Sequence, residues 1–309
     1  MFLQFFKKIK NIIINPESIM VLFCIFGFIT TSIAVSFLYF NISFGSVNTE
    51  KSPIRTDLFE KLPIRAVSVA VYDTTTDKFI YTKNGNAQLP LASITKVMTS
   101  VSALRIAEKI DAERAVKFSG NWWNLVDLMK YALVSSSNNG VTSIAEAVSR
   151  VDDENGGPVK NIDFVGEMNN IARELNLHTT YFLNETGLDV NKTLGGAYGS
   201  SKDIAKMFAY AIDKYPNVFT ATKYPEIKII SMEGANMGSR NTNIDVEKMT
   251  TLIASKTGTT DLAGGNLVIA FDAGISHPII ISILGSTPED RFKDAETLSL
   301  ATIEYLSSK

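Results

Sequence analysis

A serine and a lysine stand three residues apart in the stretch Leu91–Met98, where an apolar run with helical spacing begins. In a helix this spacing brings both side chains onto one face of the first turn. A serine hydroxyl is a poor nucleophile until a base takes its proton, and a lysine kept neutral by burial and nearby cations can be that base. The stretch therefore predicts a nucleophile, Ser93, activated by Lys96. Because chance gives about one Ser-x-x-Lys match in a chain of this length, the pair needs support from other motifs.

Two further short motifs follow along the chain. Ser136-Ser137-Asn138 is a weak pattern, because Ser-x-Asn also occurs elsewhere, for example from Ser239 to Asn241. Lys256-Thr257-Gly258 is stronger, since chance gives it in well under about one such chain in ten. The three motifs are expected at a helix start, in a turn between helices, and on a strand beside a glycine-rich turn. In this order and context they form the signature of serine penicillin-binding proteins and β-lactamases.

With these motifs the chain resembles the D-alanyl-D-alanine carboxypeptidases, which are low-molecular-mass serine penicillin-binding proteins. The similarity covers roughly residues 66–306. It includes the run from Phe182 to Asp189, with Asn184, Gly187 and Leu188, and an extended third motif from Lys256 to Gly264. The resemblance implies an α+β fold of the serine β-lactamase/transpeptidase type, with a helical subdomain.

The resemblance also implies roles for the catalytic residues. Ser93 would attack the carbonyl of the penultimate D-Ala of a peptidoglycan stem peptide and form an acyl-enzyme, while Lys96 takes its proton. Ser136 would relay a proton towards the leaving D-Ala amine, and Asn138 would hold Lys96 or the substrate amide. Water would then hydrolyse the acyl-enzyme.

The third motif is implied to bind substrate. Lys256 would supply positive charge, help to keep Lys96 neutral and, with Thr257, meet the terminal carboxylate. The backbone N–H groups of Ser93 and Thr259 would form the oxyanion hole, where one lost donor costs about 3 kcal/mol. Gly258 would let the substrate backbone lie close to the strand. β-Lactams are expected as inhibitors, and no metal or organic cofactor is implied.

The chain departs from the family pattern in several places. Asn139 stands where the family has Asp, and the segment between the first two motifs is short. The family's C-terminal β-domain and terminal membrane helix are not expected here. Arg291 or Lys293 could supply a second cation for the carboxylate, although a solvated helix start is the simpler interpretation of both.

Other functions remain open at this stage. An endopeptidase acting on peptidoglycan cross-links would need the same residues. A class A β-lactamase needs a deacylating glutamate in Glu-x-x-Leu-Asn, whereas Leu175-Asn176 has Ala172 at that position. A membrane-anchored sensor that is acylated by β-lactams but turns over slowly would keep all three motifs. A structural cell-wall protein would not need them.

The N-terminal part predicts a membrane anchor. Residues 1–17 carry Lys7, Lys8 and Lys10, and residues 18–40 form an uncharged, mainly apolar stretch long enough to span a bilayer. Lysines before this stretch predict a cytoplasmic N-terminus and an extracytoplasmic peptidase domain on a bacterial membrane. Residues 41–61 are expected to be a linker and residues 62–309 the peptidase domain. A cleaved signal peptide is the alternative.

Composition and residue patterns set further limits. A net charge of −2 without a basic block argues against nucleic acid as a partner. The only cysteine, Cys24, lies in the apolar stretch, which excludes disulfides and cysteine-based zinc sites in the folded part. Helices are predicted over 93–108, 124–134, 140–148, 163–175, 201–215 and 290–306, and strands over 67–72, 78–82, 226–232, 249–255, 266–272 and 278–284. Because the strands flank the helices in sequence, we expect one antiparallel sheet built from both chain ends.

Overall fold

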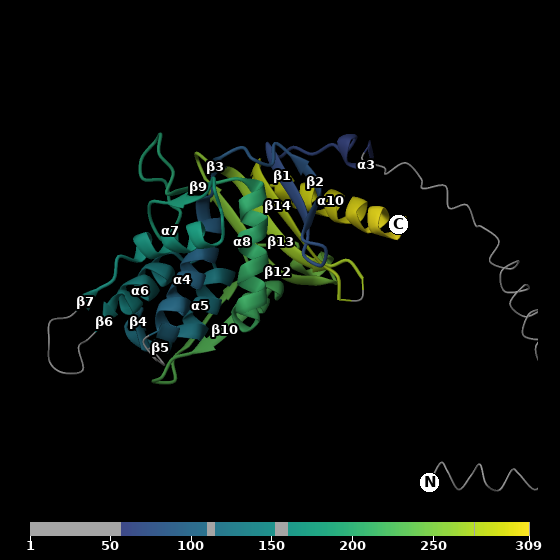
Figure 1. Cartoon of the computed structure of the whole chain (residues 1–309). Coiled ribbons are helices and arrows are strands. Elements are labelled where there is room, and N and C mark those ends of the chain that lie inside the picture. Colours follow the sequence, from purple (N-terminus) through teal and green to yellow (C-terminus); the bar gives the residue numbers. More distant parts are fainter. Residues whose placement is uncertain (1–56, 110–114, 152–159, 275, 309) are drawn as a thin grey trace, which may run out of the picture. The chain divides into compact units, whose positions relative to one another are not determined.

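The computed structural model describes residues 57–109, 115–151, 160–274 and 276–308, and Figure 1 shows their arrangement. A five-stranded antiparallel sheet has the strand order β12-β13-β14-β1-β2. Its strands are β1 (Ser68–Asp73), β2 (Lys78–Lys83), β12 (Leu252–Thr260), β13 (Gly264–Asp272) and β14 (Pro278–Ser286). Because β1 pairs with β14, the two ends of the described region join in one sheet. The predicted α+β class and the sheet built from both ends are confirmed.

The sheet is covered on both faces, and side-chain alternation along its strands creates two cores. On β1, Ala70 belongs to the core that contains α8 (Ser201–Lys214), whereas Val69 and Val71 belong to the core that contains α10 (Asp290–Ser307). Successive strand residues point to opposite faces, so a central strand covered on both sides reads as a continuous apolar run. That explains the apolar sequence of β14.

Four helices form the helical subdomain: α4 (Thr95–Lys109), α5 (Leu125–Val134), α6 (Asn138–Ser149) and α7 (Phe164–Glu174). Side-chain caps fix several starts, because Asn124, Ser137, Asp163 and Ser200 each accept a hydrogen bond from a backbone N–H in the first turn that follows. The predicted helices are confirmed to within a turn. The first one begins as the 3-10 turn η1 (Ala92–Ile94) before α4.

One predicted strand does not join the main sheet. β10 (Glu226–Ile230) pairs with β11 (Asn236–Arg240) in a separate two-stranded sheet that packs on α5. Only Ile229 of β10 is buried, so the strand has one apolar face and cannot occupy a central position. The expectation that all C-terminal strands form one sheet was wrong here.

The remaining elements are short. A hairpin of β4 (Ala115–Phe118) and β5 (Asn121–Asn124) lies between the predicted helices 93–108 and 124–134, where no strand was predicted. The other short strands are β3 (Leu89–Pro90), β6 (Arg150–Val151), β7 (Lys160–Asn161), β8 (Tyr181–Phe182) and β9 (Ala197–Gly199). The short helices are α3 (Asp57–Glu60), α9 (Pro216–Phe219), η2 (Thr220–Lys223) and η3 (Val246–Lys248).

The N-terminal helix α3 is attached to the sheet by an aromatic contact. Phe59 is buried and stacks on Tyr81 of β2 with ring centroids 4.9 Å apart, and it meets the edge of Tyr305 of α10 at 6.0 Å. Such aromatic pairs add about 1 kcal/mol beyond the area they bury. The first described residues therefore pack against the main sheet and α10.

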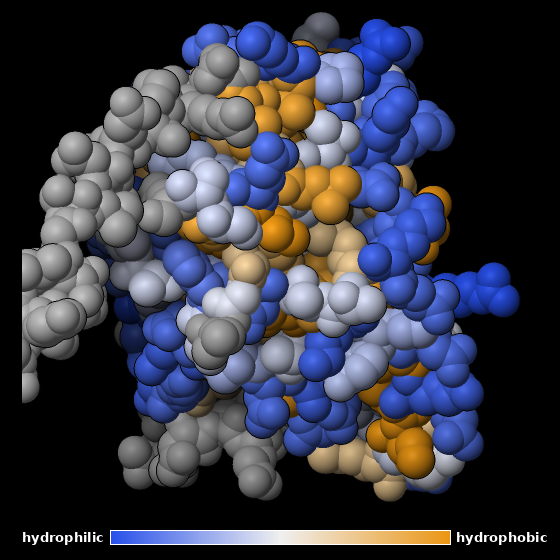
Figure 2. Space-filling view, turned by 90° about the vertical axis from the view of Figure 1, so that its right-hand side faces the viewer, coloured by the Kyte–Doolittle hydropathy of each residue, from blue (hydrophilic) through white to orange (hydrophobic). Residues whose placement is uncertain are grey.

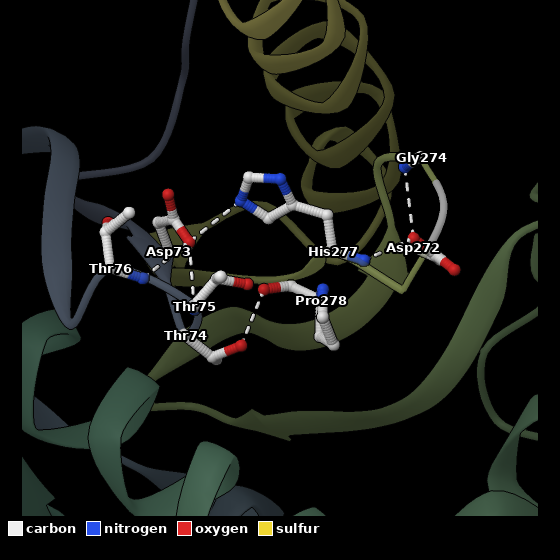
Figure 3. A network of polar contacts seen from close by, with 8 residues as sticks. All are labelled: Asp73, Thr74, Thr75, Thr76, Asp272, Gly274, His277 and Pro278. Atoms are coloured by element: carbon white, nitrogen blue, oxygen red, sulfur yellow. Dashed lines mark hydrogen bonds and ion pairs between the residues drawn. The ribbon is translucent and has the colours of Figure 1, made fainter. Parts of the chain in front are cut away.

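A polar network fastens the turns at one end of the sheet, as Figure 3 shows. His277 Nε2, just before β14, lies 2.9 Å from Asp73 Oδ1 at the end of β1. The same carboxylate oxygen accepts the backbone N–H groups of Thr75 and Thr76. In the adjacent turn Asp272 accepts backbone N–H groups from Gly274, Ser276 and His277. These contacts link the β1–β2 turn to the β13–β14 turn.

The side of the molecule on which α10 lies has a mostly hydrophilic surface with small apolar patches (Figure 2). Leu300 and Ile303 are exposed apolar residues of α10. Scattered apolar residues are normal on globular surfaces, so they carry no functional interpretation.

In the described part of the chain, no helix is both long and apolar enough to cross a bilayer. The predicted anchor at residues 18–40 lies outside the described residues, as do the predicted cytoplasmic segment, 1–17, and the linker up to residue 56.

Candidate active site

The three sequence motifs meet in space. Ser93 lies in η1, and Lys96 in the first turn of α4 places its Nζ 2.8 Å from Ser93 Oγ. The same Nζ lies 2.7 Å from the Oδ1 atom of Asn138, the first residue of α6. Across the site, Lys256 Nζ on β12 lies 2.9 Å from Ser136 Oγ. The fold thus brings two hydroxyls, two amines and an amide together from segments that lie far apart in the sequence.

Local backbone geometry shapes both serine turns. Ala92 and Ser136 adopt left-handed backbone conformations, with φ of 48° and 55°. Non-glycine residues in this region are strained and concentrate at functional sites. Asn266 of β13 fixes the turn that carries Ser93, because its Nδ2 donates a hydrogen bond to the carbonyl of Leu91 at 3.1 Å.

Gly258 is required by close packing inside the protein. A Cβ atom at this position would lie 2.9 Å from the carbonyl oxygen of Leu91 and 3.1 Å from the backbone nitrogens of Ser93 and Ile94. Any side chain would therefore push β12 away from the serine turn. The sequence suggested only that glycine admits the substrate backbone, and the structure adds this second reason.

Three acceptors surround the amine of Lys96. Besides Ser93 Oγ and Asn138 Oδ1, the carbonyl oxygen of Thr186 lies 2.7 Å from Nζ. A neutral amine has two N–H donors and one lone pair, and an amide or carbonyl oxygen can only accept. If Asn138 and Thr186 take the two N–H groups, the lone pair points at the hydroxyl of Ser93. This is the orientation that a base for that hydroxyl would need.

Burial makes a charge on either lysine costly. Burial is the main reason that the pKa of Lys96 is lowered from 10.5 to about 7, and the charge of Glu185 opposes this effect. The pKa of Lys256 is lowered well below its usual value, first by burial and then by the charges of Lys96 and Arg291. A positive charge on one amine therefore makes protonation of the other less favourable.

Arg291, at the start of α10, is buried beneath the third motif. One of its terminal guanidinium nitrogens donates to the carbonyl of Gly258 at 2.9 Å and to Thr259 Oγ1 at 2.7 Å. Its pKa is lowered, chiefly by burial. The interpretation of Arg291 as a solvated residue at a helix start was therefore wrong. For Lys293, which is exposed, that interpretation agrees with the structure.

The other motif residues line the same strand. Thr257 Oγ1 lies 2.6 Å from Thr242 Oγ1, and Thr259 is exposed beside it. Asn139, where the sequence departs from the family pattern, is exposed in the first turn of α6. Sequence reasoning gave no role to Thr186, which acts through a backbone carbonyl and so leaves no side-chain signal.

The structure also contains a hollow of about 940 Å³ on the helical subdomain, lined among others by Lys117, Trp122 and Glu146. None of the motif residues lines it, so the candidate active site is defined by the contacts around Ser93. In the described residues, no cluster of three or more His, Cys, Asp or Glu side chains could hold a metal ion.

The fold and the paired lysines are those of the serine penicillin-binding class. The chain belongs to the D-alanyl-D-alanine carboxypeptidase family, whose model matches residues 55–126 and 120–287. It is 27% identical over 248 residues to the D-alanyl-D-alanine carboxypeptidase DacF of Bacillus subtilis, covering 75% of this chain and 60% of DacF. It is 28% identical over 249 residues to a D-alanyl-D-alanine endopeptidase of Pseudomonas aeruginosa, covering 75% of each.

Solved structures agree with the fold. Penicillin-binding protein D2 of Listeria monocytogenes, in its ampicillin-bound form, superposes with a TM-score of 0.63 at 27% identity, covering 78% of this chain and 98% of that one. The Streptomyces K15 DD-transpeptidase has a TM-score of 0.62 at 22% identity, covering 79% of this chain and 99% of its own. The predicted transpeptidase-like fold is thereby confirmed.

Proposed function

We propose that this protein is a serine D-Ala-D-Ala carboxypeptidase that trims peptidoglycan stem peptides. The observation that carries the proposal is the amine of Lys96, which lies within hydrogen-bond distance of Ser93 Oγ, Asn138 Oδ1 and the carbonyl of Thr186. Membership of the carboxypeptidase family supplies the substrate class. The chain spans less than two thirds of the length of DacF, so the activity is inferred from the peptidase domain alone.

In the proposed acylation step, the Ser93 hydroxyl attacks the carbonyl carbon of the penultimate D-Ala. Its proton passes to the lone pair of Lys96, whose neutral form is substantially populated near pH 7 because burial lowers its pKa. The backbone N–H groups of Ser93 and Thr259 would stabilise the oxyanion. Ser136, held by Lys256, would pass its proton to the leaving D-Ala amine as the C–N bond breaks, and the proton taken up by Lys96 would replace it on Ser136. Water would then hydrolyse the ester on Ser93.

The cations of the site give a reason for carboxypeptidase specificity. A terminal D-Ala presents a carboxylate, which Lys256 and Thr257 on β12 would bind. Arg291 adds a second cationic side chain behind the same strand through its contacts with Gly258 and Thr259. Buried cationic side chains whose hydrogen-bond partners are neutral favour a negatively charged ligand.

A D,D-endopeptidase of peptidoglycan cross-links is the second candidate. The similarity to a Pseudomonas protein named D-alanyl-D-alanine endopeptidase favours it. The same nucleophile and base would serve both reactions. They differ in whether the leaving amine is free D-Ala or a residue of a second stem peptide.

The location is also part of the proposal. Residues 18–40 would anchor the chain in the bacterial cytoplasmic membrane, with the peptidase domain outside, where peptidoglycan lies. Support comes from the lysines before the apolar stretch and from the proposed substrate. Protease treatment of intact spheroplasts should degrade the peptidase domain, and protection of that domain would contradict this orientation.

The test of the activity is release of D-Ala. The full chain in detergent is incubated with diacetyl-Lys-D-Ala-D-Ala, and a fluorescent penicillin labels a parallel sample. Release and labelling that both disappear in Ser93→Ala would support the carboxypeptidase. Labelling without release would favour the endopeptidase if muropeptide dimers are cleaved, and a slow sensor if they are not. If folded protein shows neither D-Ala release nor penicillin labelling, the assignment of Ser93 as the nucleophile is overturned.

A further inference from the structure

The segment 184–188, between β8 and β9, is folded tightly against the serine turn. The side-chain oxygen of Asn184 accepts the backbone N–H groups of Thr186 at 3.1 Å and Gly187 at 2.7 Å. Gly187 has a φ of 77°, and a Cβ atom there would lie 1.9 Å from the carbonyl oxygen of Ala92. The loop is therefore in backbone contact with the turn that carries Ser93, and its Thr186 carbonyl reaches Lys96.

Glu185, in the middle of this loop, ties it to two helices. Its side-chain Oε1 accepts a hydrogen bond from Thr142 Oγ1 at 2.5 Å, and its backbone carbonyl accepts one from Thr99 Oγ1 at 2.6 Å. Thr142 lies one turn after Asn138 on α6, and Thr99 lies one turn after Lys96 on α4. The clamp thus connects the loop carbonyl to the two elements that supply the other partners of the amine.

Glu185 also differs in charge from the rest of the surroundings of Lys96. β12 contributes the cation Lys256, and Arg291 of α10 lies beyond it. α6 contributes the neutral amide of Asn138. The carboxylate of Glu185 acts on Lys96 in the opposite direction to burial and raises its pKa. It is half-buried and held in place by Thr142, so its position relative to the amine is fixed.

We propose that Glu185 is a positioning residue of the proposed acylation reaction. Clamped by Thr142, it fixes the Thr186 carbonyl that takes one N–H of Lys96, and it supplies the negative charge that balances the cations of the site. Only the kinetic test of this inference, the acylation rate, rests on the proposed function. The coupling between Glu185 and Lys96 can also be measured without substrate.

Two variants separate the charge from the clamp. Glu185→Gln keeps an oxygen that can accept from Thr142 but removes the charge. Thr142→Val removes the hydrogen bond and keeps the carboxylate. Glu167→Gln on α7 is the matched control, because Glu167 is also a partly buried glutamate in an ion pair, with Lys109, and has no contact with the motifs.

The experiment measures the acylation rate by a fluorescent penicillin as a function of pH. We expect the acid limb of Glu185→Gln to move to lower pH by about one unit, because loss of the carboxylate makes the Lys96 ammonium easier to deprotonate. Thr142→Val should lower the plateau rate about tenfold through misplacement of the base. Glu167→Gln should match the wild type. An acid limb that stays in place in Glu185→Gln overturns the inference.

A second readout keeps this inference apart from the proposed function. In protein labelled with ¹³C at lysine Cε, the Lys96 signal is assigned by its loss in Lys96→Met and then titrated. The midpoint should fall in Glu185→Gln, and an unchanged midpoint overturns the inference even if acylation is intact. If the protein is never acylated but the Lys96 midpoint still falls in Glu185→Gln, the proposed function is overturned and the coupling between Glu185 and Lys96 is supported.

Discussion

Around the motifs, Lys96, Lys256 and Arg291 are buried, and the hydrogen-bond partners they have there are carbonyl, amide and hydroxyl oxygens. At the β1–β2 and β13–β14 turns, by contrast, His277 lies 2.9 Å from the carboxylate of Asp73. The strand register places the two regions at different ends of the sheet. Thr260 pairs with Gly264 at one end, and Asp73 pairs with Ile279 at the other.

The two regions differ in what their buried charges do. Burial alone would raise the pKa of Asp73, but hydrogen bonds from Thr76, His277 and the turn backbone outweigh it and lower the pKa. The charged form of Asp73 is therefore the stable one. Burial of Lys96 is not outweighed, so its neutral form is populated near pH 7. Hydrogen-bond donors around Asp73 thus keep its buried charge as a structural feature, whereas burial that Glu185 only partly offsets leaves the amine of Lys96 able to accept a proton near pH 7.

Of the substitutions considered, Lys96→Met in the active site should have the largest effect on the rate of penicillin acylation. It removes the proton acceptor and keeps the length of the side chain, so the rate of penicillin acylation should fall by about 10³-fold or more. Lys83→Met is the matched control, because Lys83 is a half-buried lysine that likewise donates to backbone carbonyls, those of Ile64 and Ala66. Equal losses in both variants would show a general effect of removing a buried lysine.

Gly258→Ala should have the next largest effect. The new methyl group would press on Leu91 and on the backbone nitrogen of Ser93. We expect a loss of about 10- to 100-fold in acylation rate, with a small change in thermal stability. Gly234→Ala is the control for stability, because a Cβ atom there meets nothing within 4 Å, although its φ of 85° also strains the backbone. Unchanged acylation in Gly258→Ala would contradict the role of close packing in placing Ser93.

Asp73→Ala should affect stability alone. It leaves two backbone N–H groups and His277 without their acceptor, which costs about 1–3 kcal/mol of unfolding free energy. Because the pKa of Asp73 is lowered in the folded state, this contribution is complete above pH 4 or so and is lost as the pH falls further. Denaturant unfolding should therefore show a difference that shrinks in acid.

His277→Ala should cost less than Asp73→Ala, because the backbone donors keep their carboxylate. His178→Ala, at the other histidine of the chain, is the exposed control. Loss of acylation in Asp73→Ala at full folding would contradict the separation of the two regions.

The sequence predicted the helices well, because caps and apolar periods are local signals. Asn124, Asp163 and Ser200 each mark a helix start that the structure has. The β4–β5 hairpin was missed because four-residue strands are too short to show a period of two. The place of β10 outside the main sheet depends on tertiary packing, which no local pattern encodes.

The part of the site that is made of side chains could be predicted from the sequence. The motifs named Ser93, Lys96, Asn138 and Lys256, and the fold brings them within hydrogen-bond distance of one another or of Ser136. The Thr186 carbonyl could not be predicted, because every residue has one. The burial of Arg291 could not be predicted either, because a cation in a first helical turn is usually solvated.

We infer that Lys96 is a base because the effect of its burial on the pKa of the amine outweighs the opposing effect of the Glu185 carboxylate. The most direct test is the second-order rate of Ser93 acylation by a fluorescent penicillin between pH 5 and 9. A lysine whose folded pKa is about 7 is protonated below that pH and free to accept a proton above it. The rate should therefore rise with pH and reach half its maximum near pH 7. A rate that is flat across this range, or that is still rising steeply at pH 9, would contradict the account.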